Sequence, residues 1–160
     1  MIEIAPFAPS HSAGVVAMIL PIQRSEFGIS ITLDGQPDLQ NISGFYQQDA
    51  GNFWVALDNE KIVGTVALLD IGNRQAALRK MFVSAEYRGP KYGIAKQLLT
   101  TVIDWSHARE VQDIYLGTTA KFLAAHRFYE KNGFVEVARA DLPPSFPVMV
   151  VDTKFYRRAT

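Results

Sequence analysis

The stretch EYRGPKYGIAKQLL, residues Glu86 to Leu99, decides what kind of fold this chain adopts. It begins as a loop, with Arg88, Gly89 and Pro90 in succession, and continues into a segment whose apolar residues recur at helical spacing. The first N–H groups of a helix have no partner within the helix, and the helix dipole adds positive potential there. A glycine-rich turn directly before a helix therefore predicts a site for an anion.

The two common nucleotide-binding motifs do not fit this turn. The Walker motif requires G-x-x-x-x-G-K-[ST], whereas Gly89 and Gly93 lie four positions apart and Ile94 follows Gly93. The dinucleotide fingerprint G-x-G-x-x-G is absent as well. On its own residues the turn has two open interpretations: the glycines only permit a tight strand-to-helix connection, or they hold an anion.

The composition limits the classes of protein to which this chain can belong. Its 160 residues are 48% hydrophobic, which is enough for one sizeable core, so we expect a single domain over residues 1–160. Basic and acidic residues are equal in number, at 16 each, so we expect neither nucleic acid nor a membrane as a partner. The chain has no cysteine, which fits a reducing compartment and excludes an acyl-cysteine intermediate. No apolar run approaches the roughly 20 residues of a membrane helix, and we expect a cytoplasmic protein.

Hydrophobic periodicity and turn residues predict strands and helices along the whole chain. The predicted strands are 2–6, 52–57, 61–72, 75–83, 112–119, 134–142 and 148–156. The predicted helices are 9–20, 37–48, 94–105 and 121–132, the last with Gly133 as its C′ residue. Hairpins alternate with helical crossovers in this order. We therefore expect a mixed α/β (α+β) fold, a mostly antiparallel sheet of about six to seven strands with helices on both faces.

Two segments read together resemble the GCN5-related N-acetyltransferase (GNAT) family. LRKMFVSAEYRGPKYGIAKQLL, residues 78–99, is similar to the strand, the loop of type [QR]-x-x-G-x-[GA] and the helix of that family. AAHRFYEKNGFVEV, residues 124–137, matches its A-x-x-x-Y-x-x-x-G-F pattern at full spacing. The loop departs from the pattern, because Pro90 stands where the family has Gln or Arg and Arg88 lies two residues earlier. The order of strands and helices extends the resemblance over most of the chain.

The resemblance implies acetyl-CoA as the cosubstrate, with no metal. Main-chain groups of Phe82 and Val83 would hold the pantetheine arm in a gap between strands 75–83 and 112–119. Many relatives carry an Asn where this chain has Phe122, so Thr118 or Thr119 would replace that contact. The residues expected around the pyrophosphate are Arg88, Gly89, Lys91, Tyr92, Gly93, Ile94 and Ala95.

The resemblance also implies direct attack of an amine on the thioester in a ternary complex. Tyr129 would protonate the departing thiolate, although without its sequence context a core aromatic would be the better interpretation. Glu26, Asp34 and Asp38 lie in or beside the link between the first two helices, which lines the acceptor pocket in this family. Glu26 is the expected base, because burial beside the apolar Phe27 would suit a proton acceptor. His11, His107 and His126 are isolated, so we expect no metal site.

Arg79 and Lys80 are adjacent in a predicted strand, so the side chain of one of them should point toward the acceptor. That cation would favour an acceptor with a carboxylate or phosphate near its amine; an exposed cation on the other face is the open alternative. The acceptor itself, a small-molecule or peptide amine, is not readable from the sequence. Two other functions stay open, a non-catalytic acyl-CoA-binding or regulatory module and a purely structural domain. Exposed strand edges also make a homodimer an expectation.

Overall fold

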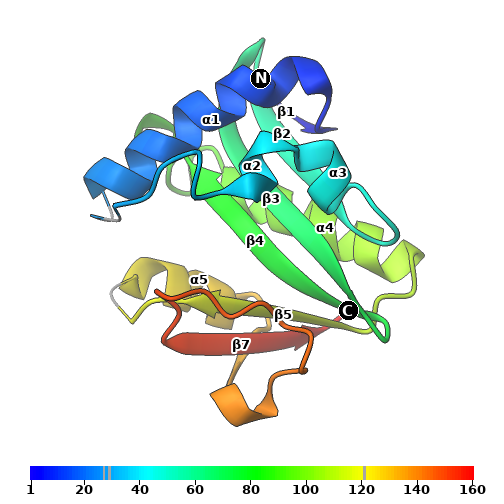
Figure 1. Ribbon diagram of the computed structural model, residues 1–160. Helices are drawn as coiled ribbons and strands as arrows, with labels where there is room; N and C mark the ends of the chain where they lie inside the picture. The colour runs from blue at the N-terminus through cyan, green and yellow to red at the C-terminus, as the bar shows by residue number, and fades with distance from the viewer. Residues whose placement is uncertain (27, 29, 121) are drawn as a thin grey trace.

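One seven-stranded sheet forms the centre of the molecule (Figure 1). The computed structural model describes residues 1–26, 28, 30–120 and 122–160. The strand order is β1-β2-β3-β4-β5-β7-β6, and within the described residues β4 and β5 form the one parallel pair. The strands are β1 (Ile2–Pro6), β2 (Asn52–Asp58), β3 (Lys61–Gly72), β4 (Gln75–Val83), β5 (Asp113–Thr118), β6 (Val135–Val137) and β7 (Lys154–Ala159).

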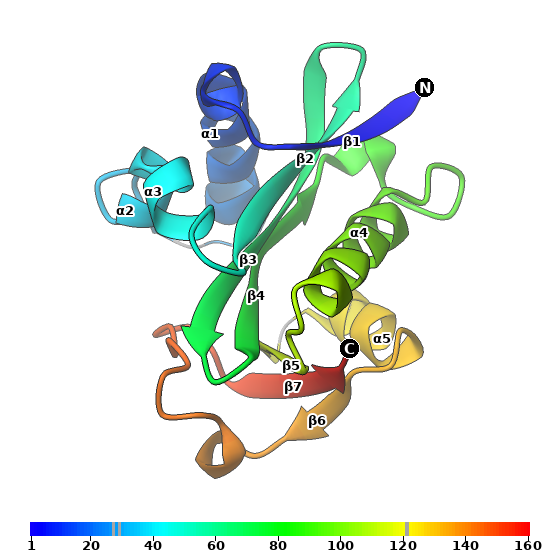
Figure 2. The same cartoon turned by 90° about the vertical axis from the view of Figure 1, so that its right-hand side faces the viewer.

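Helices cover both faces of this sheet (Figure 2). The helices are α1 (Ser12–Pro21), α2 (Pro37–Gln40), α3 (Ile42–Tyr46), α4 (Ile94–Ala108) and α5 (Leu123–Lys131). A π-helical turn, η2 (Ile22–Glu26), continues α1, and the 3-10 turns are η1 (Pro9–His11), η3 (Ala85–Tyr87) and η4 (Arg139–Asp141). The first three helices lie on one face and α4 on the other, which confirms the predicted mixed sheet between helices.

The period-2 pattern of β2 explains why both faces are covered. Phe53 and Val55 are fully buried in a cluster with the side chains of α1, α2 and α3. Trp54 and Ala56 point the other way and are buried against α4. Because alternate residues of a strand face opposite sides, a strand that is apolar from Phe53 to Leu57 must be covered on both faces.

Three predicted elements are shorter than the sequence pattern suggested. The predicted helix 37–48 is two helices, because Asn41 leaves the helical region (φ −147°, ψ 68°) and its side chain accepts a hydrogen bond from the Gly44 N–H (3.1 Å). An Asn side chain that caps a new helix in this way competes with continuation of the preceding one. The predicted strand 134–142 ends at Val137 and is followed by η4.

The predicted strand 148–156 begins only at Lys154. A turn precedes it, closed by two hydrogen bonds between Met149 and Asp152: the Met149 N–H donates to the Asp152 carboxylate (2.9 Å), and the Asp152 N–H donates to the Met149 carbonyl (3.0 Å). The apolar run Met149–Val151 therefore lies in an exposed turn instead of a strand. The predicted start of the last helix at Lys121 lies outside the described residues, and α5 begins at Leu123.

Candidate active site

The main chains of β4 and β5 diverge toward their carboxyl ends, which leaves a gap in the pairing of the sheet (Figure 1). The two strands pair only from Gln75 to Ala77, opposite Asp113 to Tyr115. Beyond Ala77 the main chain of β4 has no pairing with β5, although it continues to pair with β3 as far as Val83. Phe82 and Val83 thus lie on a strand edge beside this gap. A strand edge of this kind can bind an extended ligand through its main-chain groups.

The glycine loop leads from the end of β4 into the long helix α4. Gly93 is the N-cap residue in the left-handed region (φ 61°), and Gly89 also has positive φ (102°). The N–H of Gly93 donates to the Gly89 carbonyl (3.2 Å), which closes the turn. No described side chain caps the helix, and a Cβ atom added to either glycine would meet nothing within 4 Å. The first N–H groups of α4, including those of Ile94 and Ala95, therefore have no hydrogen-bond partner among the described residues.

Aromatic residues anchor this loop to the sheet. The Tyr87 hydroxyl donates to the Asp58 carboxylate (2.7 Å) at the end of β2. The Tyr92 ring packs on the Tyr87 ring, with centroids 5.1 Å apart, and Lys91 lies over the Tyr92 ring (5.4 Å). Lys91 is exposed and Tyr92 is half-buried. These contacts hold the loop in place while the cation of Lys91 stays accessible.

Arg88 and Glu26 come together, although they are far apart in the sequence. An Arg88 Nη1 donates to Glu26 Oε1 at 2.5 Å, and Arg88 Nε donates to the Val83 carbonyl at 2.8 Å. Both charged side chains are about one third to two fifths exposed (35% and 41%). Phe27, whose apolar side chain motivated the choice of Glu26 as the base, lies outside the described residues. The pair joins η2 to the cofactor loop.

Thr118 and Thr119 lie at the carboxyl end of β5, on the side of the gap opposite β4. The Thr118 carbonyl accepts a hydrogen bond from the Thr153 N–H (2.9 Å), and Thr118 itself is buried. The Thr119 carbonyl accepts from the Phe122 N–H (3.2 Å) and lies 2.9 Å from His126 Nε2. Both threonines are therefore fixed at the mouth of the gap, where α5 begins.

Tyr129 is a half-buried residue of α5 inside an aromatic cluster. Its ring contacts those of Phe128, Phe134 and Tyr156, with centroids 5.6 to 6.1 Å apart. Burial raises the pKa of Tyr129 to about 12. Within the part of the chain that the structure describes, no hydrogen bond involves its hydroxyl. A neutral phenol without a partner is available as a hydrogen-bond donor.

The expected alternation of Arg79 and Lys80 fails, because β4 contains a bulge at this point. Lys80 has φ 54°, and two residues of β4 oppose one residue of β3. As a result, both side chains reach toward α2 and α3. The Arg79 guanidinium lies 5.7 and 5.8 Å from the ring centroids of Phe45 and Tyr46, and its Nη2 donates to Met149 Sδ (3.6 Å).

The two cations differ in their partners. Lys80 Nζ donates to Gln36 Oε1 (2.6 Å) and lies 3.5 Å from Asp38 Oδ2, and its side chain is only 9% exposed. Burial is the main cause that lowers the pKa of Lys80. Arg79 forms no salt bridge with any described residue. Of these two cations, Arg79 is therefore the one without a carboxylate partner among the described residues.

The three carboxylates of the acceptor-side linker lie in different environments. Asp38 is buried and accepts a hydrogen bond from the Tyr46 hydroxyl (2.6 Å). Asp34 is exposed and accepts from Gln40 Nε2 (3.4 Å). Burial, the reason for choosing Glu26, thus holds for Asp38 instead. The sequence offered one signal for this, since Asp38 follows Pro37 in a short helix whose next residue is apolar, but its partner Lys80 lies far away in the chain.

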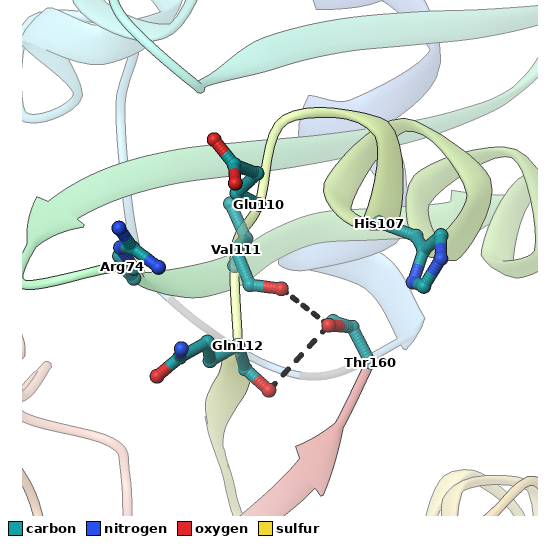
Figure 3. A pocket seen from close by; sticks show the side chains of 6 residues that line it. All are labelled: Arg74, His107, Glu110, Val111, Gln112 and Thr160. Atoms are coloured by element: carbon teal, nitrogen blue, oxygen red, sulfur yellow. Dashed lines mark hydrogen bonds between the residues drawn. The ribbon is translucent and has the colours of Figure 1, made fainter.

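One surface hollow lies away from this gap (Figure 3 shows the hollow). It encloses about 500 Å³ and is lined by Arg74, His107, Glu110, Val111, Gln112 and Thr160. The Thr160 hydroxyl donates to the carbonyl oxygens of Val111 and Gln112. These residues border the amino ends of β4 and β5, whereas the gap opens at their carboxyl ends. The hollow is therefore not part of the candidate site.

Comparison with known proteins assigns the chain to a family. A sequence model described as "Acetyltransferase (GNAT) family" matches residues 17–134, more than half of the chain. The chain belongs to this family. A crystal structure of a GNAT acetyltransferase from Staphylococcus aureus Mu50 is 44% identical and superposes with a TM-score of 0.94, covering 99% of each chain. This confirms the resemblance inferred from the sequence.

Two further known proteins cover the chain differently. The N-acetylaspartate synthetase of Xenopus tropicalis is 36% identical over 126 residues, which are 75% of this chain and 45% of that protein. This chain thus spans less than half the length of that curated relative. The PaiA N-acetyltransferase of Thermoplasma acidophilum, solved in complex with coenzyme A, is 16% identical with a TM-score of 0.73 over 100% and 99% of the two chains. At that identity the likeness is one of fold.

Two histidines of this GNAT protein, His11 and His126, have local structural partners. His11 Nδ1 accepts a hydrogen bond from the Ala8 N–H (3.0 Å), and His126 is buried beside Thr119. Among the described residues, no group of three or more His, Cys, Asp or Glu could hold a metal ion. None of the described helices combines the length and apolar character that crossing a membrane requires.

Proposed function

We propose that this GNAT protein is an N-acetyltransferase that transfers an acetyl group from acetyl-CoA directly to a primary amine in a ternary complex. The observation that carries the proposal is the departure of β4 from β5 after Ala77, beside the uncapped start of α4. The gap offers a main-chain edge for the pantetheine arm, and the helix start offers N–H groups for the pyrophosphate. Both features converge at the end of β4.

The cofactor contacts follow from this placement. Main-chain groups of Phe82 and Val83 hold the pantetheine amides, and Thr118 or Thr119 contacts the arm from the β5 side. The N–H groups of Ile94 and Ala95 bind the pyrophosphate, which approaches closely because Gly89 and Gly93 present no side chain. Arg88, Lys91 and Tyr92 surround the phosphates. In the ligand-free chain Arg88 binds the Val83 carbonyl and Glu26, so it must exchange these partners when the cofactor binds.

The chemical step needs an acid and a base from the chain. The amine nitrogen attacks the thioester carbon, the C–S bond breaks, and CoA departs as a thiolate that Tyr129 stabilises with its hydroxyl proton. Glu26 accepts the proton that the amine loses, directly or through water. The chain has no cysteine, so no acyl-cysteine intermediate forms.

The acceptor in this proposal carries a carboxylate near its amine. Arg79 supports this choice, because its guanidinium has no carboxylate partner among the described residues and lies against two aromatic rings. A guanidinium can bind a carboxylate through two parallel hydrogen bonds. The name of the Xenopus relative gives N-acetylaspartate as its product, which is an acetylated amine of this class.

The test measures CoA thiol release from acetyl-CoA with matched acceptors. L-aspartate, L-asparagine and L-aspartamide present the same amine with decreasing numbers of carboxylates, and we expect kcat/KM to fall in that order. In Arg79→Gln the KM for aspartate should rise by about tenfold to a hundredfold, the value of a charge-assisted hydrogen bond. The acetyl-CoA KM should stay the same.

Arg127→Gln is the matched control, because Arg127 is an exposed residue of α5. It should leave both KM values unchanged. Acetyl-CoA binding without thiol release for any amine would instead indicate a non-catalytic acyl-CoA-binding module. Absence of acetyl-CoA binding would leave only a structural role for the glycine loop.

A further inference from the structure

The β4 strand contains a residue in a conformation that L-amino acids rarely adopt. The register of β3 against β4 shifts between Thr65 and Ala67, where Lys80 and Met81 together face one residue of β3. Lys80 has φ 54°, in the left-handed region where a side chain crowds the following carbonyl oxygen. Such a conformation persists only where the surrounding structure over-determines it.

Three contacts hold Lys80 in this conformation. The Thr65 hydroxyl donates to the Lys80 carbonyl oxygen (2.7 Å), which fixes the main chain of the bulge. Lys80 Nζ donates to Gln36 Oε1 (2.6 Å) and forms an ion pair with Asp38 (3.5 Å). The Lys80 side chain therefore also anchors the bulge, through its Nζ atom. This charged group has almost no contact with solvent.

The anchor belongs to a buried polar network that spans the acceptor-side helices. Asp38 also accepts the Tyr46 hydroxyl (2.6 Å), and Gln36 exchanges two hydrogen bonds with Gln23 of η2 (2.9 and 3.0 Å). Asp38, Tyr46, Gln36 and Gln23 are all at most 6% exposed. The network thus ties η2, α2 and α3 to one point on β4, two residues before Phe82.

We infer that Lys80 is a positioning residue for acetyl transfer: anchored on Asp38 and Gln36, it fixes the bulge and so sets the direction of the main-chain groups of β4 that border the gap. This inference rests on the proposed function. Directions along a strand alternate, so relaxation of the bulge by one residue would turn each following N–H and C=O away from its present side. Phe82 and Val83, which the proposed function assigns to the pantetheine arm, follow the bulge directly.

Stability alone does not account for this arrangement. A buried ion pair is often no more stabilising than apolar side chains of the same volume. The left-handed conformation adds a further unfavourable contribution at the same residue. The buried ion pair and the left-handed conformation both occur at Lys80, beside the edge of β4 that faces the gap. A role of Lys80 in orienting the main-chain groups of that edge explains why they occur together.

The test separates positioning from simple stability by removing the two charges together. Lys80→Met alone leaves Asp38 buried without its cation, so we expect a lower melting temperature. Lys80→Met combined with Asp38→Asn removes both charges and keeps an acceptor for the Tyr46 hydroxyl, so we expect the melting temperature to recover. In this double variant kcat should stay at least about tenfold below that of the parent, while the Kd for CoA, held mainly at the glycine loop, changes little.

Two further variants complete the experiment. Thr65→Val keeps the volume of the side chain and removes the hydroxyl that holds the Lys80 carbonyl, so kcat should fall with little loss of stability. Lys131→Met changes an exposed lysine at the end of α5 and should alter nothing. A double variant that recovers both its melting temperature and its kcat would overturn the positioning role of Lys80 but not the proposed function. A parent protein that releases no CoA with any amine would overturn the proposed function, and this role with it.

Discussion

Tyr129, Gly133 and Phe134 share one sequence pattern but have separable roles. The end of α5 is closed by two hydrogen bonds, from the Phe134 N–H to the Tyr129 carbonyl (3.0 Å) and from the Gly133 N–H to the Glu130 carbonyl (3.3 Å). Gly133 has φ 90°, which suits glycine at this position of the motif. The helix end thus explains the spacing between Tyr129 and Phe134 without any catalysis. The pattern by itself does not establish what the hydroxyl does.

The Tyr129→Phe variant separates the hydroxyl from the ring. It keeps the aromatic packing and removes the proposed proton donor. Burial raises the pKa of Tyr129 to about 12, above the value of about 8.5 for an ordinary thiol, so the hydroxyl stabilises the thiolate mainly as a hydrogen-bond donor. We therefore expect kcat to fall by about 10²-fold, the lower end of the range for general acids. Single-turnover acetyl transfer measures this step directly.

Tyr115→Phe is the control for that experiment. Tyr115 is a buried residue of β5 in a separate cluster with Phe146 and Phe155. It should leave the chemical step unchanged. An equal rate for Tyr129→Phe and the parent would remove Tyr129 from the mechanism, and a rate loss that tracks a loss of melting temperature would show only a structural need for the hydroxyl.

The Gly93→Val variant tests the anion site at the start of α4. A valine at φ 61° is strained by roughly 1–2 kcal/mol, and its side chain would fill the open space before the helix. We expect a lower melting temperature together with a loss of CoA binding, measured by calorimetry. Gly72→Val carries a similar strain (φ 86°) with equally open surroundings, in the hairpin between β3 and β4. Gly72→Val should lower the melting temperature as much as Gly93→Val and leave CoA binding intact. Equal CoA affinity in the two variants would place the anion site elsewhere.

At the scale of the elements, the periodic segments were predictable and their interruptions were not. The strands of the central hairpins and α4 follow period-2 and helical patterns that local sequence specifies. The break at Asn41 depends on a side chain that caps the next helix, and the bulge at Lys80 depends on contacts with Asp38 and Gln36. Propensity gives no warning of a lysine with positive φ, because distant packing imposes it.

The link between η2 and the cofactor loop predicts opposite effects on binding and turnover. In Glu26→Gln, Arg88 loses its ionic partner. The neutral Gln side chain competes less strongly than Glu26 with the pyrophosphate for the Arg88 guanidinium. We expect the Kd for CoA to fall, by no more than about fivefold because an exposed pair contributes about 0–1 kcal/mol. At the same time kcat should fall, since the proposed base is gone. Calorimetry with CoA and steady-state thiol release measure the two effects.

Two comparisons make this prediction specific. Asp34→Asn removes an exposed carboxylate of the same linker and should change neither quantity. In an Arg88→Gln background the substitution Glu26→Gln should no longer affect the Kd, because residues that act through one contact are not additive. A Kd that responds to Glu26→Gln equally in both backgrounds would contradict competition for Arg88.

At the scale of the whole molecule, the site combines what local patterns encode with what only folding brings together. The glycine loop, Phe82, Val83 and Tyr129 could be proposed as site residues from the sequence because each belongs to a continuous segment with its own pattern. The pairs of Arg88 with Glu26 and of Lys80 with Asp38 join segments more than forty residues apart. Charge pairs between such segments have no characteristic spacing in the sequence. Glu26 and Arg88 were therefore predicted for separate reasons, and the contact of Lys80 with Asp38 was not predicted.

Buried tyrosines give the whole molecule a defined response to alkaline pH. Burial raises the pKa of Tyr129 to about 12, and desolvation also raises the pKa values of Tyr46 and Tyr156. In the unfolded chain a tyrosine titrates near pH 10. Between these values the folded state holds more protons than the unfolded state, so the free energy of unfolding decreases as pH rises. The stabilisation is complete below about pH 10 and is lost as pH rises toward the folded pKa values.

Denaturant unfolding between about pH 10.5 and 12 measures this loss of stability. At lower pH the lowered pKa of Lys80 has the opposite effect on the free energy of unfolding. Above about pH 10.5 that effect ends, because the lysine of the unfolded chain also loses its proton. We expect the free energy of unfolding to fall steeply with pH in the parent. Tyr129→Phe removes one of the tyrosines with a raised pKa, so its curve should be shallower by up to about 1.4 kcal/mol per pH unit, the slope of one proton. Arg127→Gln, which changes no tyrosine, should follow the parent. A parent curve that stays flat to pH 12 would show that the tyrosines ionise in the folded state without resistance, and would contradict the burial that also keeps the Tyr129 proton in place for acetyl transfer.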